Sequence, residues 1–381
     1  MTGVVHAITP GDHFSPRTGS AIPTVVHGLA TASGRDEREP RYTHRVLVGH
    51  NTFRPRYASA DAIEFTPAPA PSTRERVSDA LLARLGAPRH AAVRYFIPQA
   101  EALKRVDESV VLAHNAPALP ALLAGTQHSV VLYAHNDILR TVSSREAQKT
   151  LAGVAAIVCV SAFLAEQTAA RLPSSLAQRV HAVGNGVDCA QFTPGNAAQN
   201  ERLRVLFVGR MIPQKGADLL LKAAALLRRD DLELVLVGSR GFDSDAPLTR
   251  YERRLRELAE QCSAAVRFEP FVARDRLPEL FRQADLLVVP SRWDEPSGLT
   301  VSEGQASGLP VIASRVGGIP EVVGSAGMLV DAEAGAFAEA MAALADDAAL
   351  RRRMAQEARR HAERHDWAWS WSGLRRVLGG L

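Results

Sequence analysis

A chain of 381 residues with 46% hydrophobic and 23% charged residues is long for one hydrophobic core and has the composition of an ordinary soluble protein. These values disfavour disorder and coiled coil. Aromatic residues make up only 6% and the net charge of +4 is dispersed, which excludes the concentrated basic, aromatic stripe of a nucleic-acid binder.

No stretch reaches the roughly 20 apolar residues that span a bilayer, and the start of the chain lacks a basic region followed by a long apolar core. We therefore expect a cytoplasmic protein. Residues 1–190 hold the whole charge excess, with 19 basic and 15 acidic side chains. A solvated surface explains this excess best, and weak peripheral contact with an anionic membrane is the alternative.

Apolar runs of strand length alternate with helical patterns through the first half. One such helical pattern covers residues 161–172. The alternation predicts an α/β fold with a parallel sheet covered by helices. The predicted strands are 4–8, 45–48, 93–97, 110–113, 130–134, 157–160 and 180–183.

The second half repeats this alternation, so we predict two doubly wound, Rossmann-like domains in tandem. Predicted helices cover 218–228 and 251–260, and a polar stretch at 193–200 predicts the linker between the domains. The predicted strands are 205–208, 234–237, 266–268, 286–289, 311–313 and 328–330. The resulting division is a first domain at 1–190, a linker at 191–203, a second domain at 204–360 and a C-terminal helix at 361–381.

The tail carries Trp367, Trp369 and Trp371 at a spacing of two residues. Residues so spaced cannot all lie on one helical face, so the tail is expected to contain a break between helices.

The segment 293–303 lies between a predicted all-apolar strand and a predicted helix, a position where open α/β folds bind ligands. Gly298 lets an anion approach the free amides that begin the helix, and the helix dipole favours a phosphate there. Glu295 and Glu303 repel a phosphate but accept hydrogen bonds from sugar hydroxyls. The segment therefore predicts a ligand in which a sugar is joined to a phosphate.

Two segments resemble the signatures of one family. The Glu295-x7-Glu303 spacing and the upstream run 208–216, with Arg210 and Lys215, resemble the retaining glycosyltransferases of family 4 (glycosyl transferases group 1), in the family's order and spacing. The resemblance is close over the second half of the chain and looser over the first. It implies the GT-B fold, in which two Rossmann-like domains face each other across a cleft and a last helix crosses back to the first domain.

The resemblance also implies a reaction, namely transfer of a sugar from a nucleotide diphosphate sugar to an acceptor hydroxyl with retention of anomeric configuration. Glu295 would hold donor-sugar hydroxyls and Glu303 the ribose hydroxyls. The diphosphate would be held by Arg210, Lys215 and the amides around Gly298, Leu299 and Thr300. These cations would neutralise the leaving group, so no metal and no further cofactor is expected.

The first half supplies further site candidates. Gly19, in the loop after the first strand, would bring an amide against the donor phosphate, although the family has two adjacent glycines where this chain has Gly19-Ser20. His135 matches the family histidine that contacts the donor sugar near the acceptor. Arg17 and His114 are weaker candidates for acceptor binding. A lone histidine at a strand end is more often structural than catalytic.

Simpler explanations exist for each residue taken alone. Thr300 and Glu303 fit a helix capping box, and isolated arginines and lysines are usually surface cations. Asp243-Ser244-Asp245 has the Asp-x-Asp form of a metal site but lies in a polar loop with no partner carboxylates, so loop solvation explains it better.

Three other functions compete with the transferase as explanations of the sequence. A nicotinamide dehydrogenase needs Gly-x-Gly-x-x-Gly after a first strand, and neither half has it. A sugar-nucleotide epimerase of the same fold and a catalytically silent sugar-nucleotide-binding protein stay open as alternatives.

Overall fold

The computed structural model describes residues 2–84, 89–195, 200–241 and 246–381. They form two compact units, one made of Met1–Asn185 and Trp367–Leu381 and the other of Gly186–Asp366. The chain leaves the first unit a few residues before the predicted end at 190, and the described part of the predicted linker belongs to the second unit. Residues 196–199 of that linker lie outside the described residues.

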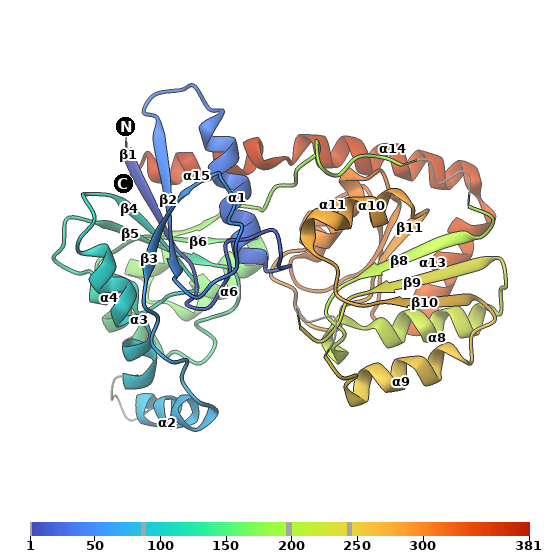
Figure 1. The fold of residues 1–381 in the computed structure, drawn as a ribbon, viewed down its shortest axis with the longest axis horizontal. Helices are drawn as coiled ribbons and strands as arrows, with labels where there is room; N and C mark the ends of the chain where they lie inside the picture. The colour runs from blue at the N-terminus through green and yellow to red at the C-terminus, as the bar shows by residue number, and fades with distance from the viewer. Residues whose placement is uncertain (1, 85–88, 196–199, 242–245) are drawn as a thin grey trace. The chain divides into compact units, whose positions relative to one another are not determined.

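The first unit is a parallel sheet in the order β3-β2-β1-β4-β5-β6-β7 with helices on both faces (Figure 1). Successive strands step outward from β1 in one direction and then, from β4, in the other, which is the doubly wound order. The strands are β1 (Thr2–Ala7), β2 (Tyr42–Gly49), β3 (Asp61–Phe65), β4 (Val110–His114), β5 (Ser129–Ala134), β6 (Val154–Cys159) and β7 (Val180–Ala182). The helices are α1 (Ala21–Gly34), α2 (Thr73–Arg84), α3 (His90–Leu103), α4 (Leu119–Leu122), α5 (Ser144–Thr150), α6 (Ala162–Arg171), α7 (Ser174–Ala177) and α15 (Trp367–Leu378).

One predicted strand of the first unit is wrong. Residues 93–97 lie inside helix α3. Their β-branched and aromatic side chains suggested a strand, but the buried positions Phe96, Ala100 and Leu103 recur at helical spacing and decide the structure. Strand β3 was not predicted, because this edge strand is mostly exposed and carries acidic residues.

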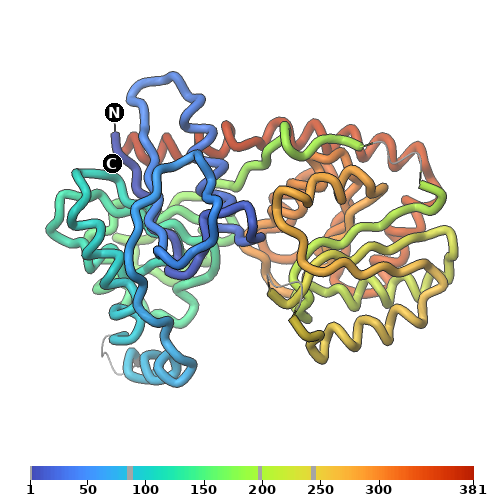
Figure 2. The backbone as a smooth tube through the Cα atoms, viewed as in Figure 1, coloured from blue at the N-terminus to red at the C-terminus, as the bar shows by residue number. Residues whose placement is uncertain are grey.

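The last helix, α15, packs against α1 in the first unit (Figure 2). The predicted helix break lies just before it, since α14 ends at Arg364 and α15 begins at Trp367. All three tail tryptophans therefore belong to one helix and spread around it. Trp371 is buried, whereas Trp369 is 42% exposed. The indole of Trp367 lies so close to α1 that a Cβ on Gly28 would be 2.2 Å from it, which requires glycine there.

The second unit is a parallel sheet in the order β10-β9-β8-β11-β12-β13, the same doubly wound order. The predicted strands and helices of this half are all present. The strands are β8 (Leu203–Val208), β9 (Leu232–Val237), β10 (Ala265–Glu269), β11 (Leu286–Val289), β12 (Val311–Ser314) and β13 (Met328–Val330). The helices are α8 (Ala217–Leu227), α9 (Arg250–Ala259), α10 (Leu277–Arg282), α11 (Leu299–Ala306), α12 (Ile319–Val323), α13 (Ala334–Asp346) and α14 (Ala348–Arg364), with 3-10 turns η2 (Pro213–Lys215) and η3 (Arg274–Arg276).

A row of four buried histidines crosses the sheet of the first unit. His44, His6, His114 and His135 come from β2, β1, the end of β4 and the residue after β5. Neighbouring rings are joined by nitrogen-to-nitrogen contacts of 2.9, 2.9 and 2.7 Å. Burial lowers the pKa of all four, to about 4 for His44 and about 3 for His135. The row is therefore neutral at neutral pH.

The histidine row predicts that the first unit loses stability in mild acid. Between about pH 6.5 and the lowered folded-state pKa values, the unfolded chain binds more protons, so the free energy of unfolding falls as the pH falls. Each histidine contributes about 1.4 kcal/mol per pH unit in that window. Urea unfolding between pH 7.5 and 5.5 measures this, followed by the fluorescence of the tryptophans in α15.

Two variants calibrate the measurement. His44→Phe should make the unfolding free energy less dependent on pH by one histidine's share. His181→Ala, which removes an exposed histidine, should leave the dependence unchanged. A slope that is the same in wild type and His44→Phe would contradict the prediction.

Candidate functional site

The predicted site residues of the second unit lie on two segments that follow the carboxyl ends of adjacent strands. Strand β8 is followed by the loop with Arg210 and Lys215, and β11 by the loop with Glu295 and Gly298. The two strands pair side by side, and the strand order reverses between them. Doubly wound folds bind ligands at this reversal point.

The backbones of the two loops approach each other closely. Gly216 has a φ of +71°, and a Cβ there would lie 1.8 Å from the carbonyl oxygen of Pro290. Only glycine satisfies both conditions. The amide of Arg292 also donates to the carbonyl of Gln214 at 2.8 Å. The loop after β11 is thus fixed against the turn that carries Lys215.

This approach brings two predicted residues into direct contact. Lys215 Nζ lies 2.5 Å from Glu295 Oε1, which also accepts a 2.6 Å hydrogen bond from Ser291 Oγ. Glu295 is only 8% exposed, and its Oε2 has no hydrogen-bond partner among the residues that the structure describes. Arg210 is exposed and forms no side-chain ion pair with any described residue. The site therefore holds one paired cation, one unpaired cation and one free carboxylate oxygen.

The backbone of Glu295 is held by a glycine pair after β12. A Cβ on Gly317, whose φ is +56°, would lie 2.4 Å from the carbonyl oxygen of Glu295. The Gly318 amide donates to that same oxygen at 2.7 Å. Close backbone packing, rather than side-chain contacts alone, fixes the position of this carboxylate.

An ion-pair network stiffens the same region. Arg292 forms two hydrogen bonds to the carboxylate of Asp218, in the first turn of α8, at 2.5 and 2.7 Å, and the Tyr251 hydroxyl donates to it at 2.7 Å. Burial opposes ionisation of Asp218, but the hydrogen bonds from Arg292 and Tyr251 outweigh it and hold its pKa well below the usual range. Sequence patterns gave no signal for this pair, because an Asp in a first helical turn is common.

The start of α11 contradicts the capping-box explanation for Thr300 and Glu303. The residue before the helix is Gly298, and no side chain caps the helix. Glu303 does not bond back to Thr300. It is 3% exposed and pairs instead with Arg274 of η3, whose guanidinium nitrogen lies 2.7 Å from Oε1. The first amides of the helix, around Leu299, have no partners within the helix.

The predicted residues of the first unit form two separate groups. Gly19 and Arg17 are exposed in the loop before α1, where Arg17 lies over the ring of Phe53 at 5.3 Å and donates to the carbonyl of Arg54. His114 and His135 are in contact through the 2.7 Å bridge of the histidine row. His6 and His44, which complete that row, were not singled out in the sequence, because their partners are distant along the chain.

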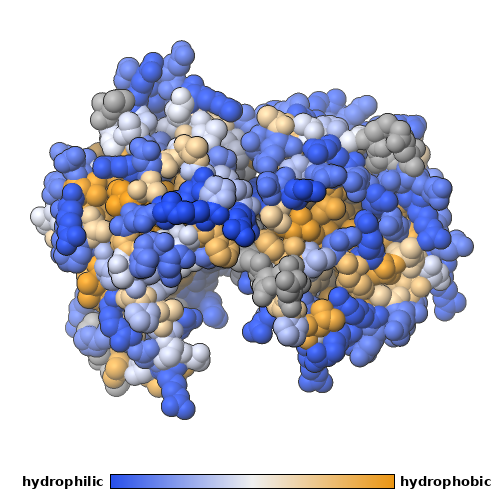
Figure 3. Space-filling view, in the orientation of Figure 1, coloured by the Kyte–Doolittle hydropathy of each residue, from blue (hydrophilic) through white to orange (hydrophobic). Residues whose placement is uncertain are grey.

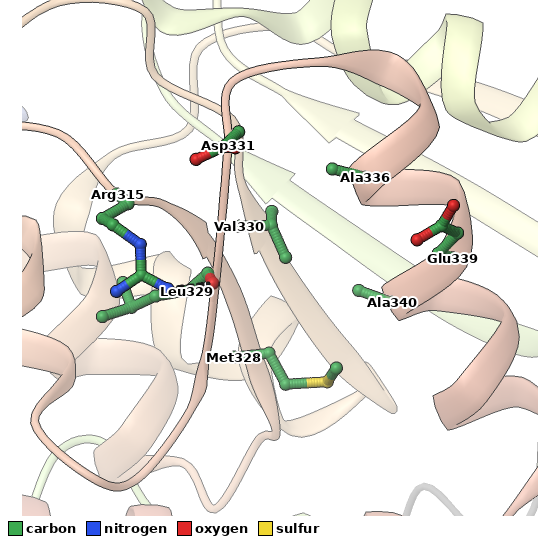
Figure 4. Close-up of a pocket in the computed structure, with 8 residues that line it drawn as sticks. All are labelled: Arg315, Met328, Leu329, Val330, Asp331, Ala336, Glu339 and Ala340. Carbon is green, nitrogen blue, oxygen red and sulfur yellow. Dashed lines mark hydrogen bonds between the residues drawn. The ribbon is translucent and has the colours of Figure 1, made fainter.

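The described residues contain no metal-binding cluster, and the open pocket in the second unit does not include the predicted site residues. No group of three or more His, Cys, Asp or Glu residues in the described ranges is placed to hold a metal ion. Asp243-Ser244-Asp245 lies outside the described residues. A shallow pocket beside β13 contains none of the predicted residues, and two of its three charged side chains, Arg315 and Glu339, lie on opposite sides of the strand (Figure 4).

The chain is similar to known glycosyltransferases in sequence. Residues 191–361 match the family described as Glycosyl transferases group 1. The D-inositol 3-phosphate glycosyltransferase of Salinispora arenicola is 39% identical over 227 residues, covering 53% of this chain and 49% of that protein. Its counterpart from Corynebacterium glutamicum is 38% identical over 208 residues, covering 50% and 49%. The chain thus spans about half the length of these curated relatives.

Similarity in structure covers both units. Anabaena HepE, solved in complex with UDP-glucose, superposes with a TM-score of 0.71 over all of both chains at 19% identity. At that identity the likeness establishes the fold, which is GT-B. The chain therefore has the GT-B fold, and residues 191–361, within its second unit, match the family described as Glycosyl transferases group 1.

Proposed function

We propose that this protein transfers a glycosyl unit from a nucleotide diphosphate sugar to an acceptor hydroxyl, with retention of anomeric configuration and without a metal. The contact between Lys215 and Glu295 carries the proposal, because it places a cation for phosphate beside a carboxylate for sugar hydroxyls. These are the two chemistries that meet in a sugar diphosphate.

In the proposed reaction the bond between the sugar's anomeric carbon and the diphosphate oxygen breaks, and negative charge grows on the diphosphate. Arg210, Lys215 and the free amides at the start of α11 stabilise that charge without reorganising. The acceptor oxygen forms the new bond on the face that the diphosphate leaves, and its proton passes to a diphosphate oxygen. The proposal assigns no second carboxylate as a nucleophile, so no covalent sugar intermediate is proposed.

The nucleotide half of the donor is assigned to Glu303. This buried carboxylate forms an ion pair with Arg274, with 2.7 Å between a guanidinium nitrogen and Oε1. Ribose hydroxyls are donors that a carboxylate accepts. UDP is the first nucleotide to test, since HepE was solved with UDP-glucose, and inositol phosphate belongs in the acceptor screen because of the relatives' names.

Lys215→Ala should lower kcat by about 100- to 1,000-fold, because it removes one preorganised cation from the departing diphosphate. It should also remove the thermal shift that UDP, GDP, ADP or dTDP gives the wild type. EDTA should change neither result. The matched control is Lys104→Ala, which removes an exposed lysine of the first unit and should behave as wild type. If none of the four nucleotides shifts the wild-type protein, the proposal fails.

Glu303→Gln should weaken nucleotide binding by about 10- to 100-fold, since a charged acceptor for hydroxyls is replaced by a neutral one. Calorimetry with the selected nucleotide and its 2′,3′-dideoxy form locates the effect. The wild type should prefer the ribose form, and the variant should bind both forms about equally. If Glu303→Gln still prefers the ribose form as strongly as the wild type does, Glu303 does not bind the ribose hydroxyls.

The epimerase and silent-binder alternatives are separated by acceptor dependence. A transferase consumes the donor in proportion to the acceptor added, whereas an epimerase converts the donor without one and a silent binder leaves it unchanged. The configuration at the anomeric carbon of the product, read by NMR, tests retention.

Peripheral membrane contact is a further proposal for the first unit. Among the described residues, no helix is long and apolar enough to cross a membrane, and the face of each unit seen in Figure 3 is mostly hydrophilic. On helix α2, however, Val77 and Leu81 are each more than half exposed to solvent, and the nearby Arg74 and Arg76 are also exposed. Apolar side chains beside arginines suit an anionic membrane surface.

Leu81→Glu should reduce cosedimentation with anionic lipid vesicles several-fold, because it places a like charge at the membrane face. Leu226→Glu, at an equally exposed leucine of α8, is the control and should have no effect. Wild-type protein that stays in the supernatant with anionic vesicles at low salt would rule out this contact.

A further inference from the structure

The histidine row runs diagonally across one face of the first unit's sheet. His44 aligns with Val4, and His6 lies two residues further along β1. His6 aligns with Leu112, and His114 lies two residues further along β4. Because side chains alternate between the faces of a strand, steps of two keep every ring on the same face. The row ends at His135, beyond the carboxyl end of β5.

Every bridge in the row joins the Nδ1 of one ring to the Nε2 of the next. The bridges run from His44 Nδ1 to His6 Nε2, from His6 Nδ1 to His114 Nε2 and from His114 Nδ1 to His135 Nε2. A neutral imidazole has one N–H and one bare nitrogen. Three intact bridges therefore allow only two arrangements, with all four protons on Nδ1 or all four on Nε2. Any mixture opposes two protons or two lone pairs and breaks a bridge.

The far end of the row decides between the two arrangements. His44 Nε2 is buried and has no hydrogen-bond partner among the described residues. The aromatic neighbour of His44 is Trp371, with ring centroids 5.4 Å apart. The indole N–H of Trp371 already donates to Asp36 at 2.8 Å, and indole offers no acceptor lone pair. A proton on His44 Nε2 would be a buried, unpaired donor, and such orphaned N–H groups are rarer than unpaired acceptors.

We propose that His6, His44 and His114 are positioning residues that hold His135 as its Nδ1–H tautomer, so that His135 presents a hydrogen-bond donor to a ligand oxygen at the carboxyl end of β5. The ligand contact rests on the proposed function, whereas the tautomer does not. The Nδ1 atom of His135 has no hydrogen-bond partner among the described residues, so it is the nitrogen left for a ligand. When Nε2 of His135 accepts a hydrogen bond, the ring's proton must be on Nδ1, and Nδ1 is then a donor.

The stacked packing of the row makes this arrangement rigid. Tyr133 stacks on both His114 and His135, with ring centroids 5.0 and 4.8 Å apart. His6 stacks on His44 and His114 at 5.2 Å. Rings fixed in this way cannot turn to form other bridges, so a change in one proton position requires a change in all four.

The test uses the whole protein with histidines labelled by 15N in the imidazole ring, because the nitrogen shifts distinguish Nδ1–H from Nε2–H. We expect His6, His44, His114 and His135 all to carry the proton on Nδ1 at pH 7.5, without any ligand. An Nε2–H signal for His135 in the wild type overturns the proposal directly, so the decision does not depend on a variant that folds.

Variants then test transmission along the row. His6→Phe should turn the His135 signals into those of a tautomer mixture, although residue 6 does not touch residue 135. His6→Gln should restore the Nδ1–H signals, since an amide can accept from His44 and donate to His114. His128→Gln, at a buried histidine of the same unit that bonds to Leu103 instead, is the control and should leave His135 unchanged. Unchanged His135 signals in a folded His6→Phe protein overturn the proposal.

Kinetics separate this inference from the proposed function. His6→Phe should lower kcat at least 10-fold, and His6→Phe/His135→Ala should be no slower than His135→Ala alone, since His6 acts through His135. Losses that multiply instead overturn the positioning role. If the tautomers are as expected but no sugar nucleotide binds, the proposed function fails and the proton order stands.

Discussion

The arrangement of the second unit's site depends on the contact between the backbones at Gly216 and Pro290. A side chain of any other residue at 216 would overlap the carbonyl oxygen of Pro290, so the loops after β8 and β11 could not pack at this distance. Their closeness lets Lys215 reach Glu295 and lets Arg292 reach Asp218. The site is thus fixed mainly by backbone packing, and the charged side chains follow from it.

The pairing of Lys215 with Glu295 has a consequence for ligand binding. A buried carboxylate without a partner is costly, and the lysine offsets that cost in the unliganded protein. In the proposed function, a sugar diphosphate would bring hydroxyl donors for the carboxylate and an anion for the lysine, so both groups would gain partners. A ligand with only one of the two parts satisfies only one of the two groups. The pair thus favours ligands that carry both.

Much of this could be predicted from the sequence, because the relevant signals are local. Apolar runs predicted twelve of the thirteen strands in the part of the chain that the structure describes, and the spacing of Glu295 and Glu303 located the loop after β11. The strand predicted at residues 93–97 was wrong because the prediction used only local signals. A short run of β-branched and aromatic residues does not show its tertiary environment. Local patterns identify elements well and partners poorly.

The residues that sequence reasoning missed all act through distant partners. Arg274 pairs with Glu303, which is 29 residues away in the sequence, and His44 contacts His6, which is 38 residues away. The residues that flank His44 in the sequence do not distinguish it from an exposed polar residue on a strand near the edge of the sheet. Only the register of the parallel strands places it two residues behind its neighbour in the row.

The neutral state of the histidine row also bears on where the acceptor's proton goes. With its pKa lowered to about 3 by burial, His135 is a weak base, and as a neutral imidazole it is not a general acid at neutral pH. Its chemistry is then limited to hydrogen bonding. The stronger base in the proposed reaction is the departing diphosphate itself, whose negative charge grows as the donor bond breaks. The proposed mechanism therefore gives the acceptor's proton to the diphosphate, leaves the histidine only hydrogen bonding, and invokes no separate catalytic base.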